Sequence, residues 1–167
     1  MPLTEKLAQA RVGVPAWARS PAKRLRAIGR GLSAQEVSEA IAKLDELSEL
    51  RDKISKDPES NCDDTDDVHF AQHDLAIALR RCSVRAAKTL ALGLASQCSG
   101  TRFWVAWSLQ VSGTRACILA IKQAIDREAD PLSRKALVTA LSHAESLGPG
   151  PLGLIRRKLR AVSASDA

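Results

Sequence analysis

Brief polar turns divide the chain after Val68 into apolar segments that recur about every 16 to 17 residues. Each segment holds its apolar residues at the spacing of an amphipathic helix. Two of the turns are nearly identical, Ser99-Gly-Thr-Arg102 and Ser112-Gly-Thr-Arg115. We expect the glycine in each turn to take the left-handed conformation that closes one helix, and the threonine to cap the next. Short helices with such brief connections must pack side by side.

The rest of the chain also favours helices. Aromatic residues make up only 3% of the sequence and Tyr is absent, so the large side chains that strands favour are scarce. Ser33-Ala-Gln-Glu36 has the form of a capping box and predicts a long helix over residues 33–56. The acidic stretch at residues 57–67 is expected to be a loop. Six shorter helices are predicted at residues 67–81, 84–96, 102–111, 114–127, 132–144 and 151–163.

One pair of these helices has the pattern of a structural repeat. Residues 130–141 begin with Asp-Pro, continue with Arg134 and then place Ala and Leu at helical spacing. This pattern resembles the second helix of HEAT-like repeats of the PBS-lyase type, and residues 114–125 are similar to the first helix. The resemblance covers about residues 66–163 and implies an all-α fold, an α-solenoid of short antiparallel helix pairs.

The resemblance also suggests how the chain is divided. Residues 1–31 are expected to form a basic, partly ordered arm, residues 32–163 a single helical-repeat domain, and residues 164–167 a tail. Charge follows a similar division: residues 1–31 carry seven basic side chains and one acidic, residues 32–78 four and thirteen, and residues 79–167 fourteen and five. The net charge of +6 therefore conceals segments of opposite sign.

Two groups of basic residues are candidates for binding a partner or a phosphate group. Their alternative interpretation is a solvated surface, with Arg102 and Arg134 paired to nearby carboxylates in the turns. The two groups are Arg80, Arg81, Arg85 and Lys88, and Arg156, Arg157, Lys158 and Arg160.

Trp104 and Trp107 lie three residues apart on one face of a predicted helix, which is typical of a protein core. The alternative is a surface on which a base or another ligand stacks. Some HEAT-repeat DNA glycosylases bind alkylated bases with tryptophans on a basic concave surface, and residues 106–135 are similar to the end of that family. Their catalytic carboxylate lies close to a tryptophan, whereas the acids nearest to Trp107 in this sequence are Asp74 and Asp126. We therefore do not expect that catalysis.

His69 and His73 are four residues apart, so one helix face would present both imidazoles, with Asp66 one turn earlier as a third metal ligand. The alternative is a half-exposed pair on the surface. The motif of zinc proteases is absent, and so are the His-Glu dipeptides of the iron-binding HEAT-repeat hydroxylases. We therefore expect no metal.

No activated nucleophile and no glycine-rich phosphate loop occur in the sequence, so we expect no cofactor and favour a protein that is not an enzyme. An enzyme or lyase that uses His69 and His73 is the alternative. No apolar run reaches the length of about 18 residues that spans a membrane, so we expect no membrane partner. The four cysteines lack the close pairs that bind metals, which favours free thiols in the cytoplasm. We expect a non-enzymatic binding module or scaffold that recognises a protein partner. The alternative is a nucleic-acid-binding protein related to HEAT-repeat DNA repair proteins.

Overall fold

The computed structural model describes residues 1–14, 21–57, 59–60, 62–82, 84–111 and 114–148, and within these ranges the chain forms helices and no β-strand. The predicted all-α class is therefore confirmed. None of the helices in these ranges combines the length and the apolar character that crossing a membrane requires. The elements in chain order are α1 (Leu3–Arg11), α2 (Ala22–Arg30), α3 (Ala34–Ile54), α4 (Cys62–Leu79), α5 (Val84–Leu92), the short 3-10 helix η1 (Gly93–Ala95), α6 (Ser99–Leu109), α7 (Arg115–Arg127) and α8 (Pro131–Leu147).

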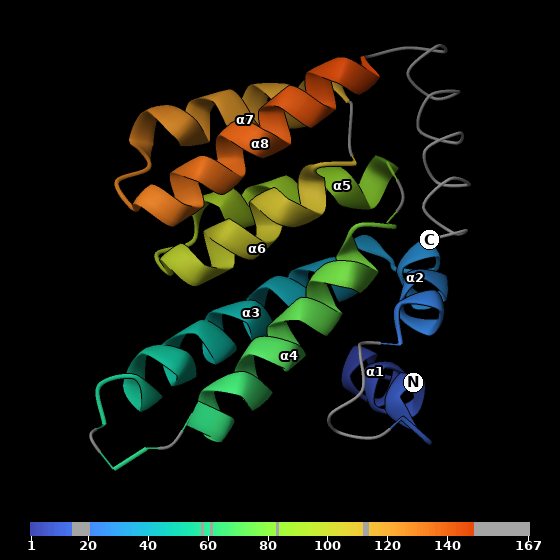
Figure 1. The fold of residues 1–167 in the computed structure, drawn as a ribbon. Helices are drawn as coiled ribbons and strands as arrows, with labels where there is room; N and C mark the ends of the chain where they lie inside the picture. The colour runs from blue at the N-terminus through green and yellow to red at the C-terminus, as the bar shows by residue number, and fades with distance from the viewer. Residues whose placement is uncertain (15–20, 58, 61, 83, 112–113, 149–167) are drawn as a thin grey trace.

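Helices α3 to α8 form three antiparallel pairs that lie side by side (Figure 1). Helix α3 pairs with α4, α5 with α6, and α7 with α8. Helix α5 contacts both α3 and α7, and α6 contacts both α4 and α8, so the middle pair lies between the other two. Helices α1 and α2 lie beside the first pair, where α2 packs on α4 and α1 contacts α3.

Local sequence accounts for the start of several helices. Ser33 caps α3 by accepting a hydrogen bond from the backbone amide of Glu36 at 3.2 Å, and the Glu36 carboxylate accepts one from the backbone amide of Ser33 at 2.9 Å. The predicted capping box is therefore confirmed. Thr114 caps α7 through the amide of Cys117 at 3.2 Å, and Asp130 caps α8 in the same way. Each side-chain oxygen satisfies an amide that the first helical turn leaves without a partner.

The start of α4 differs from the prediction. This helix begins at Cys62, within the acidic stretch that was expected to be a loop. Asp63 and Asp64 lie in its first turn. Carboxylates are favourable there because the amino end of a helix carries partial positive charge, so the acidic run extends the helix rather than preceding it.

Gly100 has a packing role instead of the expected turn role. Helix α6 begins at Ser99, and the φ of Gly100 is not positive. A Cβ at Gly100 would lie 2.8 Å from the Oγ of Ser48 on α3. Thr101, which was expected to cap the helix, is fully buried, and its hydroxyl lies 3.3 Å from that of Ser48. The close approach of α3 and α6 therefore explains this glycine, whereas the matching glycine at position 113 lies outside the described residues.

The core lies between the paired helices and consists of aliphatic side chains. Alanines occur where neighbouring helices come close, because a small side chain lets two backbones approach without leaving a void. Leucine and isoleucine fill the wider spaces. The buried alanines include Ala40, Ala76, Ala106 and Ala140, and the largest fully buried side chains include Leu44, Leu79, Leu90, Leu109, Ile121 and Leu137.

The amino-terminal helices have a small core of their own. It is formed by Ala10 of α1, Leu25 of α2 and Ile77 of α4, with Trp107 of α6 packed at its edge. Leu25 is fully buried although its neighbours in sequence are basic. The described part of residues 1–31 is therefore held against the helix pairs by apolar contacts.

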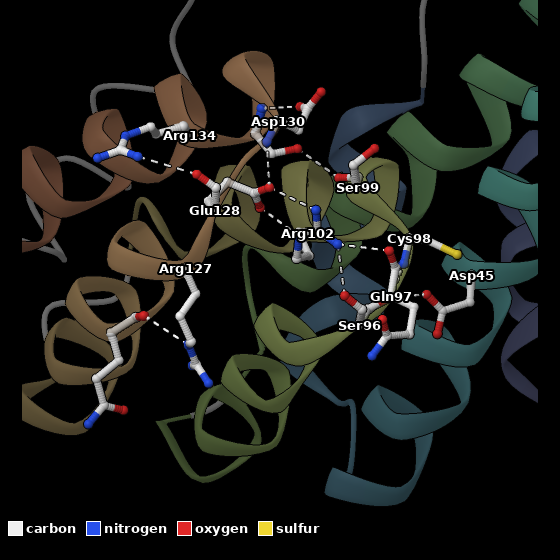
Figure 2. A network of polar contacts seen from close by, with 12 residues as sticks. Asp45, Ser96, Gln97, Cys98, Ser99, Arg102, Arg127, Glu128, Asp130 and Arg134 are labelled. Carbon is white, nitrogen blue, oxygen red and sulfur yellow. Dashed lines mark hydrogen bonds and ion pairs between the residues drawn. The ribbon is translucent and has the colours of Figure 1, made fainter.

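Arg102 links α6 to the turn between α7 and α8 (Figure 2). Its guanidinium donates to both carboxylate oxygens of Glu128, with Nε–Oε2 at 2.5 Å and Nη2–Oε1 at 2.7 Å. It also donates to the carbonyl oxygens of Ser96 and Gln97, both at 2.9 Å. The expected pairing of Arg102 with a nearby carboxylate is confirmed, whereas Arg134 donates to the backbone carbonyl of Glu128 at 3.3 Å. Both arginines stabilise the fold.

Candidate functional site

Four arginines, two from α2 and two that directly follow α4, act on one another through their charges near the end of α4. Arg80 and Arg81 follow directly after α4, and Arg26 and Arg30 lie one turn apart on α2. The two helices cross closely at Gly29, where a Cβ would lie 1.9 Å from a backbone carbonyl oxygen of α4 and 3.1 Å from the Cβ of Arg81. This crossing places Arg81 against α2, and the charges of Arg26 and Arg30 act on it, while those of Arg26 and Arg81 act on Arg80. We call these four residues the arginine cluster.

The arginine cluster concentrates positive charge. The pKa of Arg80 is lowered from its ordinary value by partial burial, and further by the charges of Arg81 and Arg26. Partial burial also lowers the pKa of Arg81, together with the charges of Arg26 and Arg30. A guanidinium stays charged at neutral pH, so these neighbouring cations repel one another. The carboxyl ends of α2 and α4 offset part of this repulsion, because a helix carries partial negative charge at that end.

Aromatic rings follow the contact between α4 and α6. The rings of His69 and His73 on α4 are stacked, with centroids 6.5 Å apart and planes 7° from parallel. Trp104 of α6 lies 5.4 Å from His69 and 5.9 Å from His73, measured between ring centroids. Trp107 lies 5.7 Å from His73 and 6.0 Å from Trp104. We call these four residues the aromatic ridge.

The two tryptophans of the ridge have different surroundings. Trp104 is 4% exposed and belongs to the main core, as expected of a helix face that packs inward. Trp107 is half-buried and packs against the small core between α1, α2 and α4. The guanidinium carbon of Arg80 lies 4.2 Å from the ring centroid of Trp107, which is a cation–π contact. The arginine cluster and the aromatic ridge therefore touch at Arg80 and Trp107.

The histidines of α4 pack against the tryptophans of α6. His69 is exposed and His73 is half-buried. Asp66 acts on His69 as a nearby charge, yet within the described residues no three His, Cys, Asp or Glu side chains converge as metal ligands. Burial lowers the pKa of both histidines from 6.5. For His69 the charge of Arg51 adds to this effect, so both rings favour the neutral form.

Asp74, the residue after His73, fastens α1 to α4. The Nε of Arg11 donates to the Oδ2 of Asp74 at 2.5 Å, and the Asp74 side chain is only 7% exposed. Of the two acids nearest to Trp107 in sequence, Asp74 is thus engaged in this ion pair, and Asp126 is exposed on α7. Asp74 therefore has a structural role, whereas Asp126 is a solvent-exposed residue.

The structure brings together only part of the basic groups predicted from sequence. Arg80 and Arg81 lie in the arginine cluster, whereas Lys88 is exposed on α5. The remaining candidates lie outside the described residues: the side chain of Arg85, and Arg156, Arg157, Lys158 and Arg160.

Sequence reasoning missed the contribution of Arg26 and Arg30. The available signal was their four-residue spacing, which places both on one side of a helix, together with Gly29 between them. A glycine inside a helix often marks a close contact with another backbone, and here that backbone is the end of α4. The partner helix itself could not be identified from the pattern.

Comparison of the chain with protein-family models, with curated proteins and with solved structures found no match.

Proposed function

We propose that this protein is a non-enzymatic binding module that binds nucleic acid through the arginine cluster. The proposal includes the HEAT-like α-solenoid class and the cytoplasm as the compartment. Support for the solenoid comes from the three antiparallel pairs, in which first helices contact first helices and second helices contact second helices. Modules of this class present extended surfaces to a partner rather than deep pockets.

The observation that carries the partner class is the contact of Arg80 with Trp107 at the edge of the arginine cluster. Clustered arginines attract any anionic segment, including an acidic stretch of a protein. Guanidinium groups beside an aromatic ring also suit the two parts of a nucleotide, since the phosphate pairs with the cations and the base stacks on flat groups. Of the two partner classes that the sequence leaves open, this arrangement favours nucleic acid.

The test is the affinity of the whole chain for a labelled oligonucleotide at two salt concentrations, about 50 mM and about 200 mM. We expect binding that weakens steeply with salt. The double variant Arg30→Gln/Arg81→Gln is expected to weaken binding roughly tenfold and to flatten the salt dependence by about 1.4 in slope for a single strand. Arg115→Gln/Lys135→Gln is the matched control, because it removes the same charge from exposed positions on α7 and α8.

Two results would overturn the proposal. One is the absence of binding to any oligonucleotide at the lower salt concentration. The other is equal weakening by the two double variants, which would assign the affinity to total charge rather than to the arginine cluster. Tighter binding to an acidic peptide of the same charge than to the oligonucleotide would favour a protein partner instead.

A further inference from the structure

We infer that the site takes single-stranded rather than double-stranded nucleic acid, with phosphates on the arginine cluster and an unpaired base against Arg80 and Trp107. This inference rests on the proposed function and narrows its substrate class. It depends on which flat groups lie beside the cations and on how charge is distributed along α4.

The first step concerns the flat groups beside the cluster. The guanidinium carbon of Arg80 lies 4.2 Å from the ring centroid of Trp107, so a guanidinium and an indole ring are already in contact at the edge of the arginine cluster. His73 adds a third planar group 5.7 Å from Trp107, measured between centroids. Bases stack on aromatic rings and on arginine planes, and the faces of a base are accessible only when it is unstacked.

The second step concerns the rigidity of this arrangement. Trp107 is held at the edge of the small core that includes Leu25, which is fully buried. The backbone contact of Gly29 with α4 fixes the distance between α2 and the end of α4. The ring of Trp107 and the backbones that carry the arginines are therefore placed before a ligand arrives, so little ordering of the backbone is needed on binding.

The third step concerns charge along α4. Its 18 residues extend about 27 Å at the rise of an α-helix. The acidic residues lie at its start, with Asp63 and Asp64 in the first turn and Asp66 and Asp67 after them, whereas Arg80 and Arg81 follow its end. A duplex laid along α4 would bring phosphates against these carboxylates. A flexible single strand can contact the arginines and leave the acidic end untouched.

The experiment compares three labelled probes of about 10 nucleotides, a length within the usual range of single-strand sites. The probes are a single strand, the same strand with abasic sugars, and a duplex. The chain is studied whole, by fluorescence anisotropy at low salt. The variants are Trp107→Leu, which removes the ring, and Trp107→Phe, which keeps a smaller one. Phe70→Leu is the matched control, because Phe70 is an exposed aromatic residue near the acidic end of α4.

We expect the single strand to bind roughly tenfold more tightly than the abasic strand, and more tightly than the duplex. Trp107→Leu should lose this preference while its affinity for the abasic strand stays the same. Trp107→Phe should keep part of the preference, and Phe70→Leu should keep all of it. Thermal melting followed by circular dichroism shows which variants are folded. If Trp107→Leu does not fold, the inference is tested by comparing the affinities for the intact and the abasic strand in the unaltered chain and in Trp107→Phe.

The inference is wrong if the abasic strand binds as tightly as the intact strand, or if the duplex binds more tightly than either. In those cases the proposed function still stands, provided that Arg30→Gln/Arg81→Gln weakens binding. If none of the three probes binds, the proposed function itself is wrong.

Discussion

The carboxylate of Glu128 and the guanidinium of Arg102 form two parallel hydrogen bonds in a place where the Glu128 side chain is 1% exposed. Glu128 lies between α7 and α8, and Arg102 lies on α6, so this ion pair joins the last two helix pairs. The pair also raises the pKa of Arg102 and lowers that of Glu128, in each case mainly through the hydrogen bonds between them. Charge, hydrogen bonding and burial therefore act together at this contact.

We predict that Glu128→Gln destabilises the protein by about 3 kcal/mol, because the half-buried guanidinium of Arg102 would lose the counter-charge that the buried Glu128 carboxylate provides. The free energy of unfolding is measured by urea titration followed by circular dichroism. Glu145→Gln is the control: Glu145 pairs with Lys122, and these side chains are 47% and 52% exposed. An exposed pair contributes about 0 to 1 kcal/mol. Equal losses for the two variants would contradict a special role for the buried pair.

Gly29→Ala is predicted to destabilise the contact of α2 with α4 by about 1 to 3 kcal/mol, the range seen when a packed contact is overfilled. The added Cβ would meet a backbone carbonyl oxygen at 1.9 Å, which a side-chain rotation cannot relieve. Gly31→Ala is the control, since its Cβ would have its nearest neighbour at 3.6 Å. The stability of both variants is measured by thermal melting. Because the crossing also positions the arginine cluster, only Gly29→Ala should weaken oligonucleotide binding.

His69 and His73 are predicted to make the protein less stable as the pH falls from about 7 to 5. Their pKa values are lowered from 6.5 in the folded chain, so the unfolded chain binds protons at a pH at which the folded chain does not. Above this window both states hold neutral histidines and the effect disappears. Urea midpoints measured across the window should vary less in His69→Gln/His73→Gln. His143→Gln, at an exposed position of α8, should behave like the unaltered chain.

Glu36→Gln is predicted to loosen both the start of α3 and the contact with α1. Its carboxylate completes the capping box with Ser33 and forms an ion pair with Lys6. The hydrogen bond from Lys6 has the largest effect on the carboxyl group, and together with the hydrogen bonds from Ser33 it lowers the pKa of Glu36 from 4.5 to about 2. The stabilisation is present above the unfolded pKa of 4.5 and is lost as the pH falls through about 2.

We expect a cost of about 1 kcal/mol at neutral pH from the capping contact, measured by urea titration. Glu39→Gln, an exposed position on the same helix, is the control. If Glu36→Gln lowers the free energy of unfolding by the same amount at pH values well below the folded pKa of Glu36, the charge of Glu36 is not the cause of the destabilisation.

The best sequence predictions concern interactions within one turn of helix. The capping box of Ser33 and Glu36 and the cap at Thr114 were predicted because donor and acceptor are three residues apart, so local backbone geometry alone brings them together. The same local rule failed at Gly100. Its surroundings include Ser48 of α3, more than fifty positions earlier in the chain, and no local pattern records that neighbour.

The candidate site also combines features that the sequence predicted locally with contacts between distant segments. Sequence alone identified helices rich in Ala and Leu, and it identified Arg80, Arg81 and Trp107 as residues worth testing. Only the tertiary structure decided that α2 crosses the end of α4, and so placed Arg26 and Arg30 in the arginine cluster. The physical reason is the range of the interactions. Helix propensity and capping act over three or four residues, whereas the contact of Gly29 with the backbone of Ala78 joins segments that the sequence keeps 49 residues apart.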